Sequence, residues 1–136
     1  MGIHSAADTE YEWPWYGRLA GAWFNGHPNN PNVRKGTFRV LDKSHPSTEG
    51  LPDRWMREDE FYNFKSIDPS IHVLVDIDEK SYEGGTNGDR HPMSWYHDFD
   101  GGRAFYTNMA TFRPSAFASA TKTRDIPPPP SSRSME

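Results

Sequence analysis

Apolar residues at helical spacing mark one short helix near the start of the chain. Its apolar face is formed by residues at positions i, i+4, i+7 and i+8, namely Trp15, Leu19, Ala22 and Trp23. Pro14 suits the first position of this helix, where its missing N–H would have no partner in any case. Residues 25–28, Asn-Gly-His-Pro, are predicted to lie beyond its end, because Gly and Pro stop helices.

Further along the chain the pattern changes to that of short strands. Residues 36–42 alternate between apolar and polar positions, which favours a strand. Residues 58–64 are either a strand or a short helix, and their aromatic residues favour the strand. Residues 72–77, His-Val-Leu-Val-Asp-Ile, form a short apolar run that is typical of a buried strand.

A hairpin is predicted after these strands. Residues 93–99 and 103–109 flank Asp-Gly-Gly, and an Asp-Gly pair favours a tight turn between antiparallel strands. Alternation places Met93, Trp95, His97 and Phe99 on one face of the first strand. We interpret that face as core, so His97 is predicted to be a packed histidine and not a ligand.

The character of the sequence changes again at about residue 110. Residues 110–136 combine small residues with four consecutive prolines and a Ser-rich end. Such a segment buries too little apolar surface to offset the entropy lost on ordering. We therefore expect residues 1–109 to form the domain and residues 110–136 to be a divergent, largely disordered tail. A polyproline ligand is the alternative for the prolines, although no second basic anchor lies nearby.

Composition narrows the classes of function. The 136 residues suffice for one domain, and 14% of them are aromatic, which argues against disorder throughout. The net charge is -4 and the basic residues are scattered, so no nucleic-acid partner is expected. The absence of Cys excludes disulfides, thiolate metal sites and a Cys nucleophile. No signal peptide or membrane span is recognisable, so we expect a cytoplasmic protein with no membrane partner.

Several short strings occur in a characteristic order and spacing between residue 1 and about residue 109. They are Gly-Ile-His-Ser-Ala-Ala-Asp (2–8), Trp-Pro-Trp-Tyr (13–16), His-Pro (27–28), His-Pro-Ser (45–47), Asp-Glu-Phe-Tyr-Asn-Phe (59–64), Tyr-Glu-Gly-Gly (82–85), His-Pro-Met-Ser-Trp-Tyr-His (91–97) and Gly-Arg-Ala-Phe-Tyr (102–106). Taken together, they resemble the ThuA-like (trehalose utilisation) family, a relative of the class I glutamine amidotransferase fold that is associated with sugar metabolism.

This resemblance implies an α/β fold with a mostly parallel sheet, related to flavodoxin-like and class I glutamine amidotransferase-like folds, plus the hairpin. Two departures suggest that the chain corresponds to the C-terminal portion of the family domain. Met1 stands directly before Gly-Ile-His, where family members have an N-terminal half, and residues 110–114 replace the Gly-His-Thr that members carry after the hairpin. Glutamine amidotransferase activity itself is excluded, because that mechanism needs a cysteine.

His4 is the first candidate for chemistry. The resemblance places it where amidotransferases of this fold have their nucleophile turn, and Gly2 permits a close backbone approach there. At such a turn His4 would act as a general base or bind sugar hydroxyls, with Asp8 orienting it; the alternative is a histidine that only holds the turn. Asp59 and Glu60 point to opposite faces of a strand, so they cannot act as a pair. Either of them alone could reach a site, and Glu60 is the third catalytic candidate, with a solvated strand edge as the alternative.

Five further residues are predicted to bind substrate. His27 and His91 each precede a proline, which extends the backbone and can aim an imidazole into a cleft. Arg103 would contact a sugar oxygen, or else form a surface ion pair. Trp15 and Tyr16, like Tyr62, would offer flat apolar faces to a sugar ring, unless they belong to the core. The six histidines lack metal-ligand spacing, so we expect no metal and no cofactor. The alternative is a metal held where the His-Pro loops of His27, His45 and His91 converge.

Three functional hypotheses follow. The first is a sugar-metabolism protein that acts on a disaccharide or keto-sugar by acid/base chemistry around His4. The second is a non-catalytic carbohydrate-binding or accessory module, and the third is a degenerate fragment without a function of its own. Under the first, His4 should lie at the carboxyl end of a strand and face a crevice, because ligands of open α/β sheets bind there. The expected partner is a small carbohydrate, and no oligomeric state is predicted.

Overall fold

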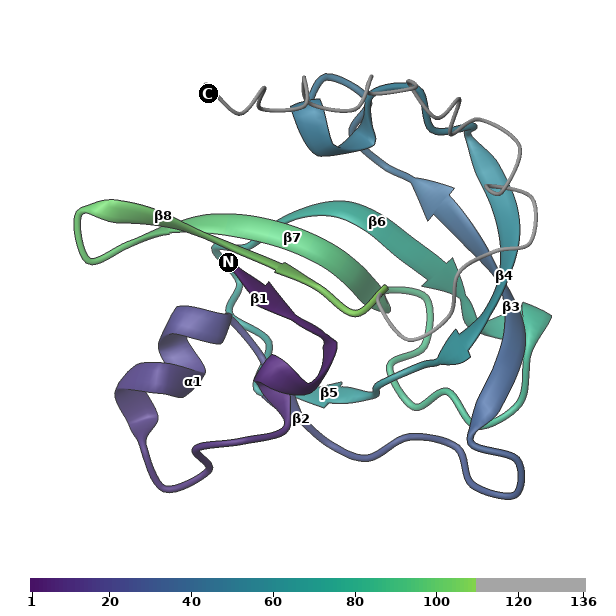
Figure 1. Cartoon of the computed structure of the whole chain (residues 1–136), viewed down its shortest axis with the longest axis horizontal. Coiled ribbons are helices and arrows are strands. Elements are labelled where there is room, and N and C mark those ends of the chain that lie inside the picture. The colour runs from purple at the N-terminus through teal and green to yellow at the C-terminus, as the bar shows by residue number, and fades with distance from the viewer. Residues whose placement is uncertain (110–136) are drawn as a thin grey trace, which may run out of the picture.

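The computed structural model describes residues 1–109, which form a curled six-stranded sheet with one short helix packed against it (Figure 1). The six strands, in their order across the sheet, are β1 (Gly2–Ile3), β8 (Gly102–Thr107), β7 (Pro92–Phe99), β6 (His72–Asp78), β3 (Val33–Val40) and β4 (Arg54–Glu60). A separate two-stranded sheet pairs β2 (Trp23–Phe24) with β5 (Phe64–Lys65). The helices are α1 (Pro14–Ala20) and the 3-10 turns η1 (His4–Ala7), η2 (Pro46–Thr48) and η3 (Glu79–Ser81). The expected tail, residues 110–136, lies outside the described residues.

The fold class is α/β, but its strand pairing differs from what the resemblance implies. Within residues 1–109 the one parallel pair is β1 with β8, and every other pair is antiparallel. The expectation of a mostly parallel sheet is therefore wrong for this part of the chain. The physical reason is that parallel neighbours need a long crossover, whereas β7 and β8 are joined by a two-residue turn.

Helix α1 begins at Pro14, as predicted, but it ends at Ala20, earlier than the apolar pattern suggests. Gly21 stops the helix by adopting a left-handed conformation, with φ of 84°. Trp23 then belongs to β2, and its ring folds back onto the helix at Gly17. A Cβ at Gly17 would lie 1.9 Å from Trp23 Cζ2, so only glycine permits this contact. The apolar spacing of Trp23 thus reflects packing against the helix and not membership of it.

The predicted hairpin is confirmed, with β7 and β8 antiparallel and Phe99 paired with Gly102. Asp100 and Gly101 form the turn, and both have positive φ (50° and 76°), which suits the twist of a two-residue hairpin. The strand at residues 72–77 is confirmed as β6, whose Leu74, Val75 and Ile77 are fully buried in the middle of the sheet. None of the helices in residues 1–109 is long and apolar enough to cross a membrane.

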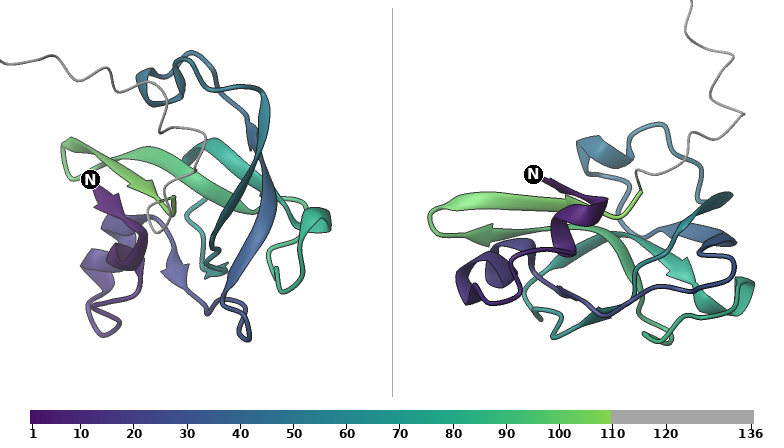
Figure 2. Two further views of the ribbon diagram at one scale, coloured as in Figure 1. Left: turned by 45° about the vertical axis from the view of Figure 1, so that its right-hand side comes forward. Right: turned by 60° about the horizontal axis from the view of Figure 1, so that its bottom comes forward.

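The curl of the sheet brings its two edges toward each other, as the additional views show (Figure 2). After β4 the chain crosses to β5, and the rings of this crossing segment fill the interior. Phe61 joins the core cluster of β3, β6 and β7, whereas Tyr62 and Phe64 pack with Trp95 and Tyr106 near α1. Of the strand predicted at residues 58–64, residues 58–60 belong to β4. Residues 61–63 cross to β5, which begins at Phe64.

His97 is packed in the core, as predicted, with 4% of its surface exposed. Its ring lies against Gly21, where a Cβ would stand 2.7 Å from His97 Cε1. Among the described residues neither ring nitrogen has a hydrogen-bond partner. His97 thus fills the space between β7 and Gly21, the residue at the end of α1.

The close approach at Gly36 generates a test of the core. A Cβ there would lie 2.7 Å from Ile77 Cδ1 and 2.8 Å from Phe61 Cε2, both fully buried. Gly36→Ala should lower the free energy of unfolding by about 1–3 kcal/mol through overpacking. Gly102→Ala is the matched control, because its nearest new contact would be 3.7 Å away, and it should change stability by less than about 0.5 kcal/mol. Chemical denaturation measures both, and equal stabilities would contradict the packing described here.

Candidate functional site

Three strand ends meet on one side of the curled sheet. Ile3 pairs with Thr107 in the parallel pair, so the next residues, His4 and Asn108, lie at the same carboxyl edge. β4 ends at Glu60 on the opposite edge of the sheet, and the curl brings that end across. Asn108 Nδ2 donates to the Glu60 carbonyl oxygen at 2.9 Å, and His4 Nε2 lies 3.4 Å from the same oxygen.

His4 sits on a strained turn. It directly follows β1 and has φ of 46°, in the left-handed region that side chains other than glycine seldom adopt. The buried Tyr106 hydroxyl donates to the His4 carbonyl oxygen at 2.6 Å and holds this conformation. Non-glycine strain of this kind costs about 1–3 kcal/mol and gathers at functional sites. The turn therefore presents the imidazole at the strand end, as a nucleophile elbow presents its side chain.

The Glu60 carboxylate is the centre of the polar cluster. Oε2 lies 3.7 Å from His4 Nε2, and Oε1 lies 3.7 Å from His27 Nε2. Asn32 Nδ2 donates to Oε1 at 2.6 Å, which fixes the orientation of the carboxylate. The side chains of His4, Glu60 and His27 are 13%, 15% and 26% exposed, so the cluster is sheltered yet reachable from solvent. Nowhere in residues 1–109 are three His, Cys, Asp or Glu side chains arranged to hold a metal ion.

The ring of Tyr62 supports both histidines. Its centroid lies 4.3 Å from that of His4 and 5.9 Å from that of His27, and the His27 ring is nearly parallel to it, at 19°. Phe24 packs edge-on against the other part of the ring at 4.6 Å. Burial, and then the nearby Glu60 carboxylate, raise the pKa of Tyr62 well above its ordinary value. Tyr62 therefore keeps its proton at neutral pH and can act as a hydrogen-bond donor.

His91 lies behind Tyr62 and has no exposed surface. Its Nε2 lies 2.8 Å from the Tyr62 carbonyl oxygen, and its Nδ1 lies 2.7 Å from Glu79 Oε1 and 3.2 Å from the Tyr82 hydroxyl. Burial lowers the pKa of His91, against the opposing effects of the Tyr62 carbonyl and the Glu79 carboxylate. Although His91 was predicted to bind substrate, the structure gives it no contact with solvent. It fixes the backbone of Tyr62 instead.

The remaining predicted residues lie apart from Glu60 or are engaged elsewhere. The Asp8 carboxylate accepts a hydrogen bond from Tyr11, and no bond between Asp8 and His4 is formed among the described residues. Trp15 packs edge-on against Phe99, with ring centroids 5.4 Å apart. Tyr16 donates to the Ala6 carbonyl oxygen at 2.7 Å. Arg103 lies over the Tyr96 ring and beside Asp98 on the exposed hairpin.

Two residues of the cluster were not predicted. Asn32 lies in the polar loop before β3, where several asparagines and prolines in succession gave no reason to choose it. Asn108 follows β8, and the rule that ligands bind at the carboxyl ends of parallel strands would have found it once the β1–β8 pairing was known. Asn108 is 1% exposed, and its Oδ1 has no hydrogen-bond partner within the described part of the chain.

The fold and the cluster define an α/β protein with titratable side chains gathered at the carboxyl end of its parallel strand pair. The model of the ThuA family, described as trehalose utilisation, matches residues 1–117, and the chain belongs to this family. No curated protein sequence matches it.

Two solved structures share the fold. A ThuA-like protein from Bacteroides uniformis is 24% identical, with a TM-score of 0.62, and one from Parabacteroides merdae is 20% identical, with a TM-score of 0.60. The matches cover 79% and 78% of this chain, but only 47% of each solved chain. The chain thus spans about half the length of these relatives.

The buried position of His91 predicts a pH dependence of stability. Because its pKa is lower in the folded state, the unfolded state binds the proton first as the pH falls below about 6.5, and folding is progressively disfavoured until the folded pKa is passed. His91→Gln should flatten this loss between about pH 7 and pH 5, while costing about 1–3 kcal/mol at neutral pH for the disturbed buried hydrogen bonds. Denaturant titrations at several pH values measure both effects. His45→Gln is the control and should keep the wild-type slope, because the His45 imidazole contacts the Ser47 hydroxyl and not a carboxylate. An unchanged slope in His91→Gln would contradict the assignment.

Proposed function

We propose that this chain takes part in sugar metabolism, and that it binds a small carbohydrate at the His4–Glu60 cluster and acts on it by acid–base chemistry. The observation that carries the proposal is the strained His4 turn, which aims an imidazole at a carboxylate that a second imidazole also faces. Membership of a family described as trehalose utilisation supplies the substrate class. A disaccharide or a keto-sugar is the substrate that we propose.

The chemistry can be assigned to particular atoms. His4 Nε2 faces two oxygens that only accept, the Glu60 carbonyl and the Glu60 carboxylate, so it carries the proton of the neutral ring. Nδ1 is then the base that takes a proton from a sugar hydroxyl, or from the carbon next to the carbonyl group of a keto-sugar. Glu60 stabilises the imidazolium that forms, since a carboxylate at 3.7 Å favours the charged ring. A separation of 3.7 Å is longer than a hydrogen bond, but catalytic contacts often tighten only when substrate is bound. His27, on the other oxygen of Glu60, is placed to return a proton or to bind a hydroxyl.

Binding of the sugar would rest on the polar groups that line the cluster. The Tyr62 hydroxyl is hydrogen-bonded to the Glu60 side chain, and Asn108 Oδ1 is an acceptor without a partner among the described residues. A buried polar atom without a partner is costly, and a ligand hydroxyl would relieve that cost.

A second candidate is a non-catalytic carbohydrate-binding module. The observation that favours it is the packing of both imidazoles on Tyr62, which makes His4 and His27 parts of a rigid wall as well as titratable groups. In that case the same cluster binds the sugar and no bond is changed. Binding and turnover must therefore be measured separately.

The test compares His4→Asn with the wild-type protein on a panel of disaccharides and keto-sugars. Asn tolerates the left-handed backbone at position 4, so the melting temperature should stay nearly unchanged, whereas kcat should fall by about 10²–10⁴-fold with loss of the base. Glu60→Gln should also lower kcat, because the imidazolium loses its counter-charge. His72→Asn is the matched control, since His72 is an exposed histidine on β6 outside the cluster.

Each outcome has a distinct meaning. Turnover that His4→Asn does not reduce would overturn the catalytic proposal. Sugar binding by the wild-type protein that is lost in His4→Asn, with no turnover of any sugar, would favour the binding module. No binding of any sugar in the panel would contradict both.

A further inference from the structure

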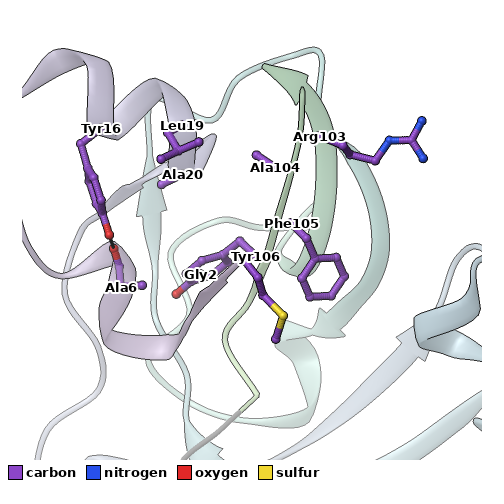
Figure 3. Close-up of a pocket in the computed structure, with 10 residues that line it drawn as sticks. Gly2, Ala6, Tyr16, Leu19, Ala20, Arg103, Ala104, Phe105 and Tyr106 are labelled. Carbon is purple, nitrogen blue, oxygen red and sulfur yellow. Dashed lines mark hydrogen bonds between the residues drawn. The ribbon is translucent and has the colours of Figure 1, made fainter. Parts of the chain in front are cut away.

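The strand β4 lies at an edge of the main sheet. It pairs with β3 along its whole length, and within residues 1–109 no strand lies on its other side. Figure 1 shows β3 and β4 together at the right-hand margin of the molecule. The β8 side of the sheet is different, because β1 pairs with β8 and Leu19 of α1 faces Ala104 there (Figure 3).

Every second residue of β4 points its backbone hydrogen-bonding groups away from β3. Val40 N donates to the Asp53 carbonyl oxygen at 2.9 Å, so the even-numbered residues of β3 direct their N–H and C=O toward β4. These residues pair with odd-numbered residues of β4, and the even-numbered residues of β4 therefore face outward. Glu60 confirms this, because its carbonyl oxygen bonds to Asn108 and not to β3. The outward row before Glu60 consists of Arg54, Met56 and Glu58.

The side chains of the same three residues form the exposed face of β4. Met56, in the middle, is 64% exposed and is one of the few large apolar side chains so exposed among the described residues. Arg54 and Glu58 lie two residues to either side of it and carry opposite charges. A charge on an edge strand usually discourages another strand from pairing. Here the charges are arranged symmetrically about Met56, so an antiparallel second copy of the row presents the complementary charge at each position.

We propose that β4 is a self-association edge, at which two copies of this chain pair antiparallel about a two-fold axis at Met56. Met56 forms a bonded pair with Met56 of the second copy, since its N–H and C=O both point outward. Arg54 of each copy lies opposite Glu58 of the other, which places an ion pair on each side of the axis. Antiparallel pairing centred on Arg54, Arg57 or Glu58 would instead place like charges directly opposite each other, so the charges select the register at Met56.

The first measurement is the oligomeric state of the full 136-residue chain by sedimentation over a range of concentrations. We expect a reversible monomer–dimer equilibrium. Hydrogen exchange of the Arg54, Met56 and Glu58 amides should be slower in the dimer than in the monomer by at least about tenfold. The amides of Trp55 and Arg57 face β3 in both states and should change less. These readouts need no activity, so they are independent of the function proposed above.

Two charge reversals and their combination locate the contact. Arg54→Glu and Glu58→Arg each replace attraction by repulsion on both sides of the axis, and each should raise the Kd of the dimer by at least about tenfold. The double variant exchanges the two charges and should restore the wild-type Kd to within about threefold. Arg54→Glu also removes the hydrogen bond from Arg54 to Asp78 within the chain, but the double variant keeps that loss, so its rescue reports the contact between copies. Arg18→Glu, an exposed reversal on α1, is the control and should leave the Kd unchanged.

The proposal is overturned if the wild-type chain stays monomeric up to about 1 mM. It is also overturned if neither single reversal weakens the dimer, or if the double variant fails to restore it. Slow exchange of the three outward amides in the monomer would assign the edge to another segment of the same chain and would contradict self-association as well.

Discussion

The candidate site depends on the contact that joins the two sides of the curled sheet, the hydrogen bond from Asn108 Nδ2 to the Glu60 carbonyl oxygen. This bond joins the end of β8 to the end of β4, which lie four strand positions apart in the sheet. A single hydrogen bond contributes only about 1 kcal/mol to stability, so it cannot curl a sheet alone. The curl is driven by the rings of Phe61, Tyr62 and Phe64, which follow β4 and bury apolar area on the inside of the sheet. The hydrogen bond then selects the position at which the two edges meet.

The contact between the two sides of the sheet and the strained turn at His4 stabilise each other. His4 keeps its left-handed backbone because Tyr106 binds its carbonyl oxygen and Tyr62 packs against its ring. Tyr62 is held in turn by His91, whose imidazole is bound to its backbone and to Glu79. The strain at His4 is thus offset by buried rings and buried hydrogen bonds several residues away. That arrangement is what keeps an imidazole fixed beside a carboxylate without a direct hydrogen bond between the side chains.

Local signals in the sequence were sufficient for the local structure. Pro14, the Asp100-Gly101 turn and the apolar run of β6 each specify their element through short-range physics. Alternation also separated Asp59 from Glu60 correctly: Asp59 is fully buried beside Arg57, whereas Glu60 reaches the cluster. Contacts between residues far apart in the sequence could not be predicted from such local patterns. His27 and His91 both precede proline, yet one faces the Glu60 carboxylate and the other is sealed behind Tyr62, and only the curl of the sheet distinguishes them.

The parallel pair β1–β8 carries the candidate site at its carboxyl end, where His4 and Asn108 lie. Within the pair, Gly2 lies beside Tyr106, and a Cβ at Gly2 would stand 3.1 Å from the Tyr106 ring. The same Tyr106 holds the His4 turn through its hydroxyl. The start of β1 and the turn that presents His4 are thus linked through one buried tyrosine.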